Sequence, residues 1–388
     1  MIQEKRLVDE FIELVRIDSP SKKEGKLSSL VVQKLKSLGA KRCDLKRCDL
    51  KVFIDKAGKK IGSNGSNIIA KISGNNNLPP VMLNAHIDTV TPGQSIKPII
   101  ADSIVKSDGT TILGADDKSG VAIILEVLRV LVEQNLSHPP IDVVFTICEE
   151  IGLLGVKNLD FSLLDAKCGY SLDTEEITSI TTAAPSHNKI EVKIYGVESH
   201  AGAEPEKGIS AIEVASQAIA KMRLGKIDDE TTANIGKISG GTATNIVPGY
   251  TEVKGEARSH SEEKLAQQIQ HIIQCFRDAV NERGKVVDSK SIFARIEEKV
   301  TREYTKFNIP ATEEVVQRVI KAGDRIGLNM GTRKGGGGSD ANVFNEKGIK
   351  TVIIGTGMQR VHTRQEFIKI SDLVLGAKLV LEILHQEK

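Results

Sequence analysis

The chain lacks tryptophan altogether, and aromatic residues make up only 3% of its 388 residues. This scarcity argues against the aromatic platforms on which single-stranded nucleic acids stack. Lysines and arginines are scattered and the formal net charge is only +2, so no basic face for nucleic acid is expected either. A content of 40% hydrophobic and 27% charged residues is typical of a globular protein, and the length suggests two domains.

The sequence also lacks a disulfide framework and a long hydrophobic run. Its five cysteines are an odd number without a CxxC pair, which favours a reducing compartment, the cytoplasm. Segment 1–21 is charged and amphipathic and has no apolar centre of the kind found in signal peptides. The most apolar helical segment, 121–132, contains Glu126 and Arg129 and is too short to span a membrane. We therefore expect a cytoplasmic protein without nucleic-acid or membrane partners.

A five-residue motif, KRCDL, occurs twice in tandem at 41–45 and 46–50. We interpret it as a duplication in a surface turn. Cys43 and Cys48 could bind a metal, but no neighbouring Cys/His pair completes a tetrahedral site.

Strand and helix patterns alternate in the first half of the chain and again near its end. This alternation predicts an α/β domain with helices on both faces of its sheet. The expected strands are 67–73, 81–85, 142–148, 169–172 and 351–355. The expected helices are 28–38, 119–134, 311–325, 339–346 and 371–386, with one more at the N-terminus.

The order between these two parts becomes β-α-β-β-α-β, which predicts two helices packed on one four-stranded antiparallel sheet. The segments concerned are 188–196, 209–222, 231–241, 251–259, 261–283 and 290–300. The predicted fold is therefore α/β, a mixed-sheet domain (1–184 and 302–388) with an inserted α+β domain (185–301). The two edges of the inserted sheet must be paired or protected, and pairing across a two-fold axis would make a homodimer.

Acidic residues and histidines follow the predicted strands of the first domain, and one precedes a helix. In open α/β sheets ligands bind outside the carboxyl ends of the strands, so these distant residues are expected to share one crevice. The residues are His86, Asp116, Glu149, Glu150, Asp173 and His362.

This residue set predicts a metal site. Histidines and carboxylates suit Zn²⁺, and also Co²⁺ or Mn²⁺. Five of these residues, all except Glu149, would be ligands. That number exceeds the need of one tetrahedral metal and fits two metals that share a carboxylate, which we assign to Asp116. Asp88 can accept a hydrogen bond from the second ring nitrogen of His86, because both side chains point the same way on an extended segment. Glu149, free of metal beside Glu150, is the predicted general base.

The segment GADDKSG (114–120) has two interpretations. Asp116 and Asp117 could be a solvated helix cap, since carboxylates favour helix N-termini. The alternative is a buried pair whose charge is neutralised by metal, because burial without a partner is costly. Lys118 is interpreted as a solvated or capping charge.

The glycine run 335–338 also has two interpretations. It could be a flexible linker, or its backbone N–H groups at a helix start, around Gly337 and Ser339, could bind a substrate carboxylate. The run lacks the GK[ST] ending of a P-loop, so ATP binding is not expected.

Eight motifs in this order are together similar to the M20 metallopeptidase family, nearest to its peptidase T-like (tripeptide aminopeptidase-like) branch. The resemblance covers essentially the whole chain. The motifs are NAHIDTV, GADDKSG, TICEEIGLLG, SLDTE, SHAG, TNIVP, GGGSDANVF and VHT.

The resemblance implies a zinc-exopeptidase-like catalytic domain with a lid and dimerisation domain, and it implies a role for each motif residue. One metal would be held by His86 and Asp173 and the other by Glu150 and His362. Asp116 would bridge them and form a cis peptide bond with the residue after it. Three residues of the inserted domain are implied to contact substrate, the first by stabilising the tetrahedral intermediate: His200, Asn245 and Arg258.

These inferences predict a di-zinc exopeptidase that hydrolyses short peptides by a metal-activated water, as an aminopeptidase. An amidase acting on N-acyl amino acids would use the same chemistry and is the first alternative. A non-catalytic metal-binding scaffold is the second, although a scaffold has no use for a free Glu149 carboxylate beside a metal pair.

Overall fold

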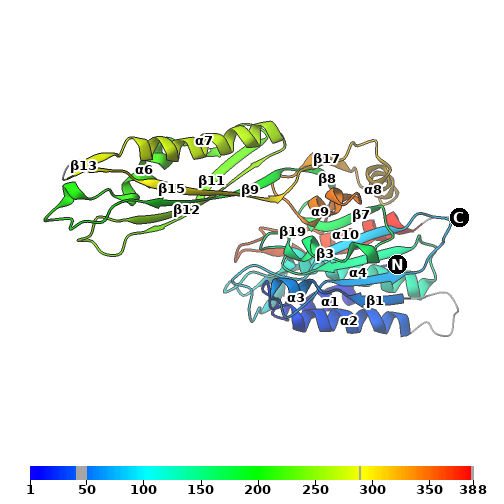
Figure 1. Ribbon diagram of the computed structural model, residues 1–388. Helices are drawn as coiled ribbons and strands as arrows, with labels where there is room; N and C mark the ends of the chain where they lie inside the picture. The colour runs from blue at the N-terminus through cyan, green and yellow to red at the C-terminus, as the bar shows by residue number, and fades with distance from the viewer. Residues whose placement is uncertain (41–49, 288–289, 386–388) are drawn as a thin grey trace. The chain divides into compact units, whose positions relative to one another are not determined.

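The structure, a computed structural model, describes residues 1–40, 50–287 and 290–385, and the chain divides into two compact units. Figure 1 labels the elements of both units. The second unit is an insertion in the sequence of the first, which is resumed after it. The first unit comprises Met1–Ala183, Phe307–Gly335 and Ser339–Lys388, and the second Ala184–Lys306 and Gly336–Gly338. The KRCDL duplication lies outside the described residues except for its last residue, Leu50.

The first unit is built on a nine-stranded mixed sheet of order β1-β2-β6-β3-β7-β18-β8-β16, with β17 beside β8. The central strands β6, β3, β7 and β18 run parallel, so their carboxyl ends lie at one edge of the sheet. β3 and β6 are buried at every position, as is typical of central parallel strands. The strands are β1 (Leu50–Ile54), β2 (Ile68–Ile72), β3 (Val81–His86), β6 (Ile141–Thr146), β7 (Cys168–Thr174), β8 (Ser179–Ala184), β16 (Phe307–Asn308), β17 (Gly331–Lys334) and β18 (Lys350–Gly355).

The helix α4 is the centre of the helical layer in this unit. It packs against β3 and β7 and contacts α1 and α10. Its first fourteen residues are all buried, the charged ones included, so this part of the helix has no exposed polar face. The helices are α1 (Glu4–Val15), α2 (Gly25–Ala40), α3 (Ala57–Ile61), α4 (Ala115–Gln134), α5 (Leu154–Lys157), α8 (Glu314–Arg325), α9 (Asp340–Glu346) and α10 (Ile370–Leu384), with a 3₁₀ turn at Phe161–Leu163.

A small antiparallel sheet of order β19-β20-β5-β4 joins two distant segments of the first unit. The strands are β4 (Pro98–Ala101), β5 (Ile104–Ser107), β19 (Met358–Gln359) and β20 (Phe367–Lys369). The sequence did not predict this sheet, because strands of two to four residues are too short for a periodic pattern to be recognised. Its consequence is that the loop between β19 and β20, which carries His362, is anchored at both ends.

The second unit has the predicted β-α-β-β-α-β order, with α6 and α7 packed on an antiparallel sheet of order β10-β11-β12-β9-β15. Figure 1 shows α7 lying along the strands. The sheet has five strands rather than four, because the two-residue β10 leaves no pattern in the sequence, and the expected last strand is broken into β14 and β15. The elements are β9 (Ser186–Tyr195), α6 (Ala211–Ala220), β10 (Gly225–Lys226), β11 (Thr231–Gly240), β12 (Tyr250–Ser259), α7 (Glu262–Asn281), β13 (Lys285–Val287), β14 (Lys290–Ile292) and β15 (Arg295–Tyr304), with a 3₁₀ turn at Pro205–Lys207.

Serine N-caps begin the two helices of this unit, and one apolar face of the sheet packs against these helices. The side chains of Ser210 and Ser261 accept backbone N–H bonds at the starts of α6 and α7. Residues that alternate along β9, such as Val192 and Ile194, are buried against the helices with Phe276 of α7. Within the part of the chain that the structure describes, no helix is long and apolar enough to cross a membrane.

Candidate metal centre

The carboxyl ends of the parallel strands carry most of the predicted site residues. His86 is the last residue of β3, Asp173 lies near the end of β7, and Glu149 and Glu150 follow β6. His362 lies in the loop between β19 and β20, with a left-handed backbone (φ 62°) that is rare for a residue with a side chain. The first unit brings the side chains of this set together around Asp116.

The Asp116 carboxylate lies between two imidazole rings. Its Oδ1 is 2.9 Å from Nε2 of His86, and its Oδ2 is 3.1 Å from Nε2 of His362. The same His362 nitrogen is 3.0 Å from Oε1 of Glu150. Each Asp116 oxygen therefore faces a different histidine, which is the arrangement that a carboxylate shared by two cations requires.

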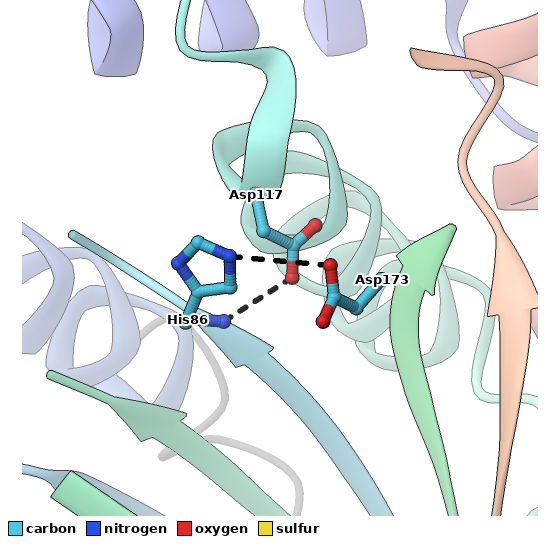
Figure 2. A group of neighbouring side chains, drawn as sticks. All are labelled: His86, Asp117 and Asp173. Atoms are coloured by element: carbon cyan, nitrogen blue, oxygen red, sulfur yellow. Dashed lines mark hydrogen bonds and ion pairs between the residues drawn. The ribbon is translucent and has the colours of Figure 1, made fainter. Parts of the chain in front are cut away.

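Figure 2 shows two further carboxylates beside His86, those of Asp117 and Asp173, which point toward it. Oδ1 of Asp173 is 3.9 Å from Nε2 of His86. Asp117 was not among the predicted ligands, yet it offers a carboxylate oxygen within 4.8 Å of donor atoms of both neighbours. That carboxylate also accepts the backbone N–H groups of His86 and Gly120, each at 3.2 Å. Asp117 thus joins the end of β3 to the start of α4.

The start of α4 explains how two adjacent aspartates enter the interior. Gly114 has a left-handed backbone (φ 76°), and the dihedral angles of Asp116 and Asp117 are not helical. The peptide bond between the two aspartates is cis, as the resemblance implied. Both side chains are buried, with exposed fractions of 8% and 0%. The interpretation of this pair as a solvated helix cap is therefore wrong.

Buried acids outnumber the bases at this centre. Burial raises the pKa of Asp117, Glu150 and Asp173, and the carboxylates around them raise it further. Hydrogen bonds to Asp116 and Glu150 raise the pKa of His362 to about 10. A divalent cation would stabilise the charged carboxylates, so this donor set of imidazole nitrogens and carboxylate oxygens fits zinc or a similar ion.

Glu149 differs from its neighbour Glu150. It is 8% exposed, and within the described chain no hydrogen bond from another protein group reaches its carboxylate. Burial raises its pKa well above the ordinary value; His86 opposes this, and Asp173 and Glu150 add to it. A buried carboxylate with an affinity for protons and no hydrogen-bond partner has the properties of a general base.

Asp88 lies beside the second ring nitrogen of His86, as expected, and makes further contacts. Nδ1 of His86 lies 2.9 Å from the backbone oxygen of Asp88 and 3.5 Å from its carboxylate. The carboxylate also accepts the hydroxyl of Ser21 at 2.6 Å and the backbone N–H groups of Glu149 at 2.9 Å and Glu150 at 3.3 Å. Asp88 therefore fixes both the histidine ring and the turn of the two glutamates.

Two buried glutamates and a buried lysine near the site were not predicted. Glu24 accepts the backbone N–H and the thiol of Cys148, and Glu366 accepts N–H groups before α4. Lys118 is fully buried and donates to the backbone oxygen of Ile17 at 2.7 Å, so its interpretation as a solvated charge is wrong. No sequence signal identifies such residues, because their partners are far away in the chain.

Four of the predicted substrate-binding residues belong to the second unit. Nδ1 of His200 accepts the backbone N–H groups of Gly202 and Ala203, at 3.2 and 3.0 Å, so Nε2 carries the hydrogen of the neutral ring. The backbone oxygen of Asn245 accepts the N–H of Ala201 at 2.9 Å, which brings Asn245 beside the His200 loop.

Arg258 is the third of these residues. Its Nε and Nη2 bind the two carboxylate oxygens of Glu256 at 2.9 and 3.1 Å. Its Nη1 faces the glycine run, 3.7 Å from the position that a Cβ on Gly337, the fourth residue, would occupy. Ser339 belongs to the first unit, where it caps α9 and its own backbone N–H is bonded to Asn342.

Comparisons with known proteins agree with this fold. The model of the peptidase dimerisation domain matches residues 183–283, and that of peptidase family M28 matches 67–179. A tripeptidase from Staphylococcus aureus is 39% identical, with a TM-score of 0.90, over 99% of this chain and 98% of its own. Aminopeptidase PepT from Bacillus cereus is 39% identical, with a TM-score of 0.85 and the same coverage. The uncharacterized protein YqjE of Bacillus subtilis is 41% identical over 100% of this chain and 99% of its own.

The fold, the matched families and these relatives define the class: the protein is a peptidase, a hydrolase with a mixed-sheet catalytic unit and an inserted dimerisation-type domain. The chain belongs to the M20 peptidase family, and it is one of the peptidase T-like members.

Proposed function

We propose that this peptidase is a di-zinc aminopeptidase that acts on short peptides. The observation that carries the proposal is the Asp116 carboxylate, whose two oxygens face two different histidines. His86 and Asp173 would hold one ion, and His362 and Glu150 would hold the other, with Asp116 between them. Co²⁺ or Mn²⁺ would suit the same nitrogen and oxygen donors.

Two divalent ions, when bound, would polarise the scissile carbonyl and lower the pKa of water. The chain itself supplies the proton transfer. Glu149 would take the proton of the attacking water and return it to the amine of the leaving product. Its raised pKa suits it for this role, as does a carboxylate that accepts no hydrogen bond from the described residues. Asp88 would hold Glu149 in place through the backbone.

The short-peptide substrate is proposed from the names of the tripeptidase and aminopeptidase relatives. In the inserted domain, Arg258 would bind a substrate carboxylate, with Asn245 and the backbone at Gly337 adding contacts. Ser339, in the first unit, is proposed as a further substrate contact. His200, whose Nε2–H is left to donate, would stabilise the developing oxyanion.

The assembly is proposed to be a homodimer. Residues 185–301 would form the dimerisation domain, and 1–184 with 302–388 the catalytic domain, in a cytoplasmic enzyme. The support is the match of 183–283 to the peptidase dimerisation domain. Strands β10 and β15 lie at the two ends of the inserted sheet, where a second copy would extend it.

A substrate screen tests the proposal. Metal-free protein, supplied in turn with Zn²⁺, Co²⁺ or Mn²⁺, is assayed on di- and tripeptides, on the same tripeptides with a blocked amino terminus, and on N-acetyl amino acids. We expect release of the N-terminal residue from free tripeptides and no release after blocking. Faster hydrolysis of N-acetyl amino acids than of any peptide would replace the aminopeptidase by the amidase. The Glu149→Ala variant controls for contaminating peptidases.

A further inference from the structure

Glu366 is a buried carboxylate, 1% exposed, that binds one short segment of backbone. Its Oε2 accepts the N–H groups of Leu113 at 2.7 Å and Gly114 at 2.8 Å. Its Oε1 accepts the N–H of Asp116 itself at 3.0 Å. The three donors lie immediately before the helical part of α4, so the glutamate fixes the backbone on which the Asp116 carboxylate is mounted.

The same glutamate belongs to the loop that carries His362. The backbone N–H of Glu366 bonds to the oxygen of Thr363 at 3.1 Å, which closes a turn directly after the histidine. The next residue, Phe367, begins β20, which pairs with β5. Glu366 therefore joins two segments far apart in the sequence, one carrying Asp116 and the other carrying His362.

We propose that Glu366 is a positioning residue for the metal centre: it sets the separation of Asp116 and His362, and through that separation the affinity for the ion between them. The inference rests on the proposed function, because it concerns metal binding. Asp116 Oδ2 and His362 Nε2 are 3.1 Å apart. The Glu366 carboxylate is bonded to the backbone of Asp116 itself, so it links the His362 loop directly to the main chain of the other ligand.

The contact requires both the carboxylate group and the side-chain length of glutamate. A carboxylate accepts on both oxygens, so it can serve three N–H donors at once. Glutamine has one accepting oxygen, and its NH₂ group would face at least one of the N–H donors at Leu113, Gly114 or Asp116. Aspartate keeps both oxygens but is one methylene shorter, so it cannot reach the segment from the same backbone position.

Glu126 provides a matched control in the same unit. It is a fully buried glutamate of α4 that accepts the backbone N–H of Gln3 at 3.1 Å and binds the Arg6 guanidinium. Arg129 of the same helix also donates to it at 3.3 Å, and none of these partners belongs to the metal centre. Glu126→Gln removes a buried carboxylate of the same kind and reports the general cost of such a change.

The experiment compares wild type, Glu366→Gln, Glu366→Asp and Glu126→Gln as full chains. Metal-free proteins are titrated with Zn²⁺ against a competing chelator, the absorption bands of bound Co²⁺ are recorded at saturation, and thermal unfolding of the metal-free forms checks folding. We expect both Glu366 variants to bind Zn²⁺ about 10–100-fold more weakly, the usual loss when a residue that orients a ligand is changed. Their Co²⁺ spectra should also change. Glu126→Gln should lose thermal stability and keep wild-type affinity and spectrum.

Two outcomes would overturn the inference. Wild-type affinity and an unchanged Co²⁺ spectrum in Glu366→Gln would remove the positioning role. Full affinity in Glu366→Asp together with weak binding in Glu366→Gln would show that only the negative charge matters. A wild-type protein that binds neither metal would instead refute the proposed di-metal function, so the two failures are distinguishable.

Discussion

The Asp88 carboxylate accepts the backbone N–H of Glu149 at 2.9 Å, so the segment after β3 holds the turn after β6. The same carboxylate reaches the N–H of Glu150 at 3.3 Å and the hydroxyl of Ser21 at 2.6 Å. One side chain therefore orients both glutamates of the site, one a proposed base and the other a proposed ligand.

Asp88→Asn tests this relationship. An amide has one accepting oxygen, so it cannot bond all three donors, and we expect both kcat and metal affinity to fall about 10–100-fold. The assays are steady-state kinetics and zinc titration of metal-free protein. Ser21→Ala is the matched control, because it removes one donor and leaves the backbone contacts to the glutamates. A wild-type kcat in Asp88→Asn would contradict the orienting role.

Glu149→Ala should lower kcat by about 10²–10⁴-fold while two metal equivalents stay bound, because a general base is lost and no ligand is removed. Kinetics and elemental analysis of the same preparation measure both quantities. Glu150→Ala is the companion variant and should lose metal, since Glu150 is a proposed ligand. Near-normal turnover in the first variant, or two full equivalents of metal in the second, would refute the respective role.

Arg258→Ala should raise KM about tenfold or more for peptides with a free C-terminal carboxylate, the loss expected for a charged hydrogen bond. Arg258→Lys should rescue little, because Glu256 engages the fork of the guanidinium and an ammonium group cannot make the same pair. The comparison is between each peptide and its C-terminal amide. An equal rise in KM for a peptide and its C-terminal amide would show that Arg258 does not bind the substrate carboxylate.

His200 is predicted to act in the site of the partner subunit. His200→Ala and Glu149→Ala should each be inactive alone. In their mixed dimer one site combines an intact Glu149 with an intact His200 of the other subunit, and the second site carries both defects. Co-expression should therefore restore at most about a quarter of wild-type activity in a random mixture. If demonstrated heterodimers stay inactive, His200 does not act across the interface.

Glu256 gives a prediction for stability at acidic pH. The contact with His187, whose Nε2 lies 3.2 Å from Oε2 of Glu256, lowers its pKa to about 2; burial opposes this, and Arg258 adds to the lowering. Because the folded-state pKa lies below the unfolded value of about 4.3, the stabilisation is present above that value and is lost as the pH falls toward 2. At pH 7 the free energy of unfolding of wild type should exceed that of Glu256→Gln by about 1 kcal/mol, a value reduced for solvent screening. The difference should narrow between pH 5 and pH 3.

Urea unfolding at pH 7, 5, 4 and 3 measures this difference. Glu252→Gln is the control, since Glu252 lies on the same strand and pairs with Lys254 at 3.4 Å instead of with His187. A difference between wild type and Glu256→Gln that stays constant with pH would rule out the ion pair as its cause.

The sequence predicted the parts of the fold that have long periodic patterns. The central strands, α4 and the β-α-β-β-α-β order of the inserted unit are visible because their apolar residues repeat over many positions. The short strands were not predicted, because two to four residues are too few to show an apolar repeat. They include β10 and the small sheet that anchors the His362 loop. The VHT motif therefore suggested a role for His362, but the sequence did not predict that short strands hold its loop at both ends.

The sequence by itself determined which ligand and acid–base side chains are available: histidines and acids at strand ends, the paired aspartates and the adjacent glutamates. Only the tertiary structure decided which groups meet. Asp117 and Glu366 contact the site, Lys118 is buried, and Asp88 binds the backbone after β6 in addition to its contact with the His86 ring. The reason is physical: a side chain's residue type is local, but its burial and its hydrogen-bond partners depend on segments that lie far away in the chain.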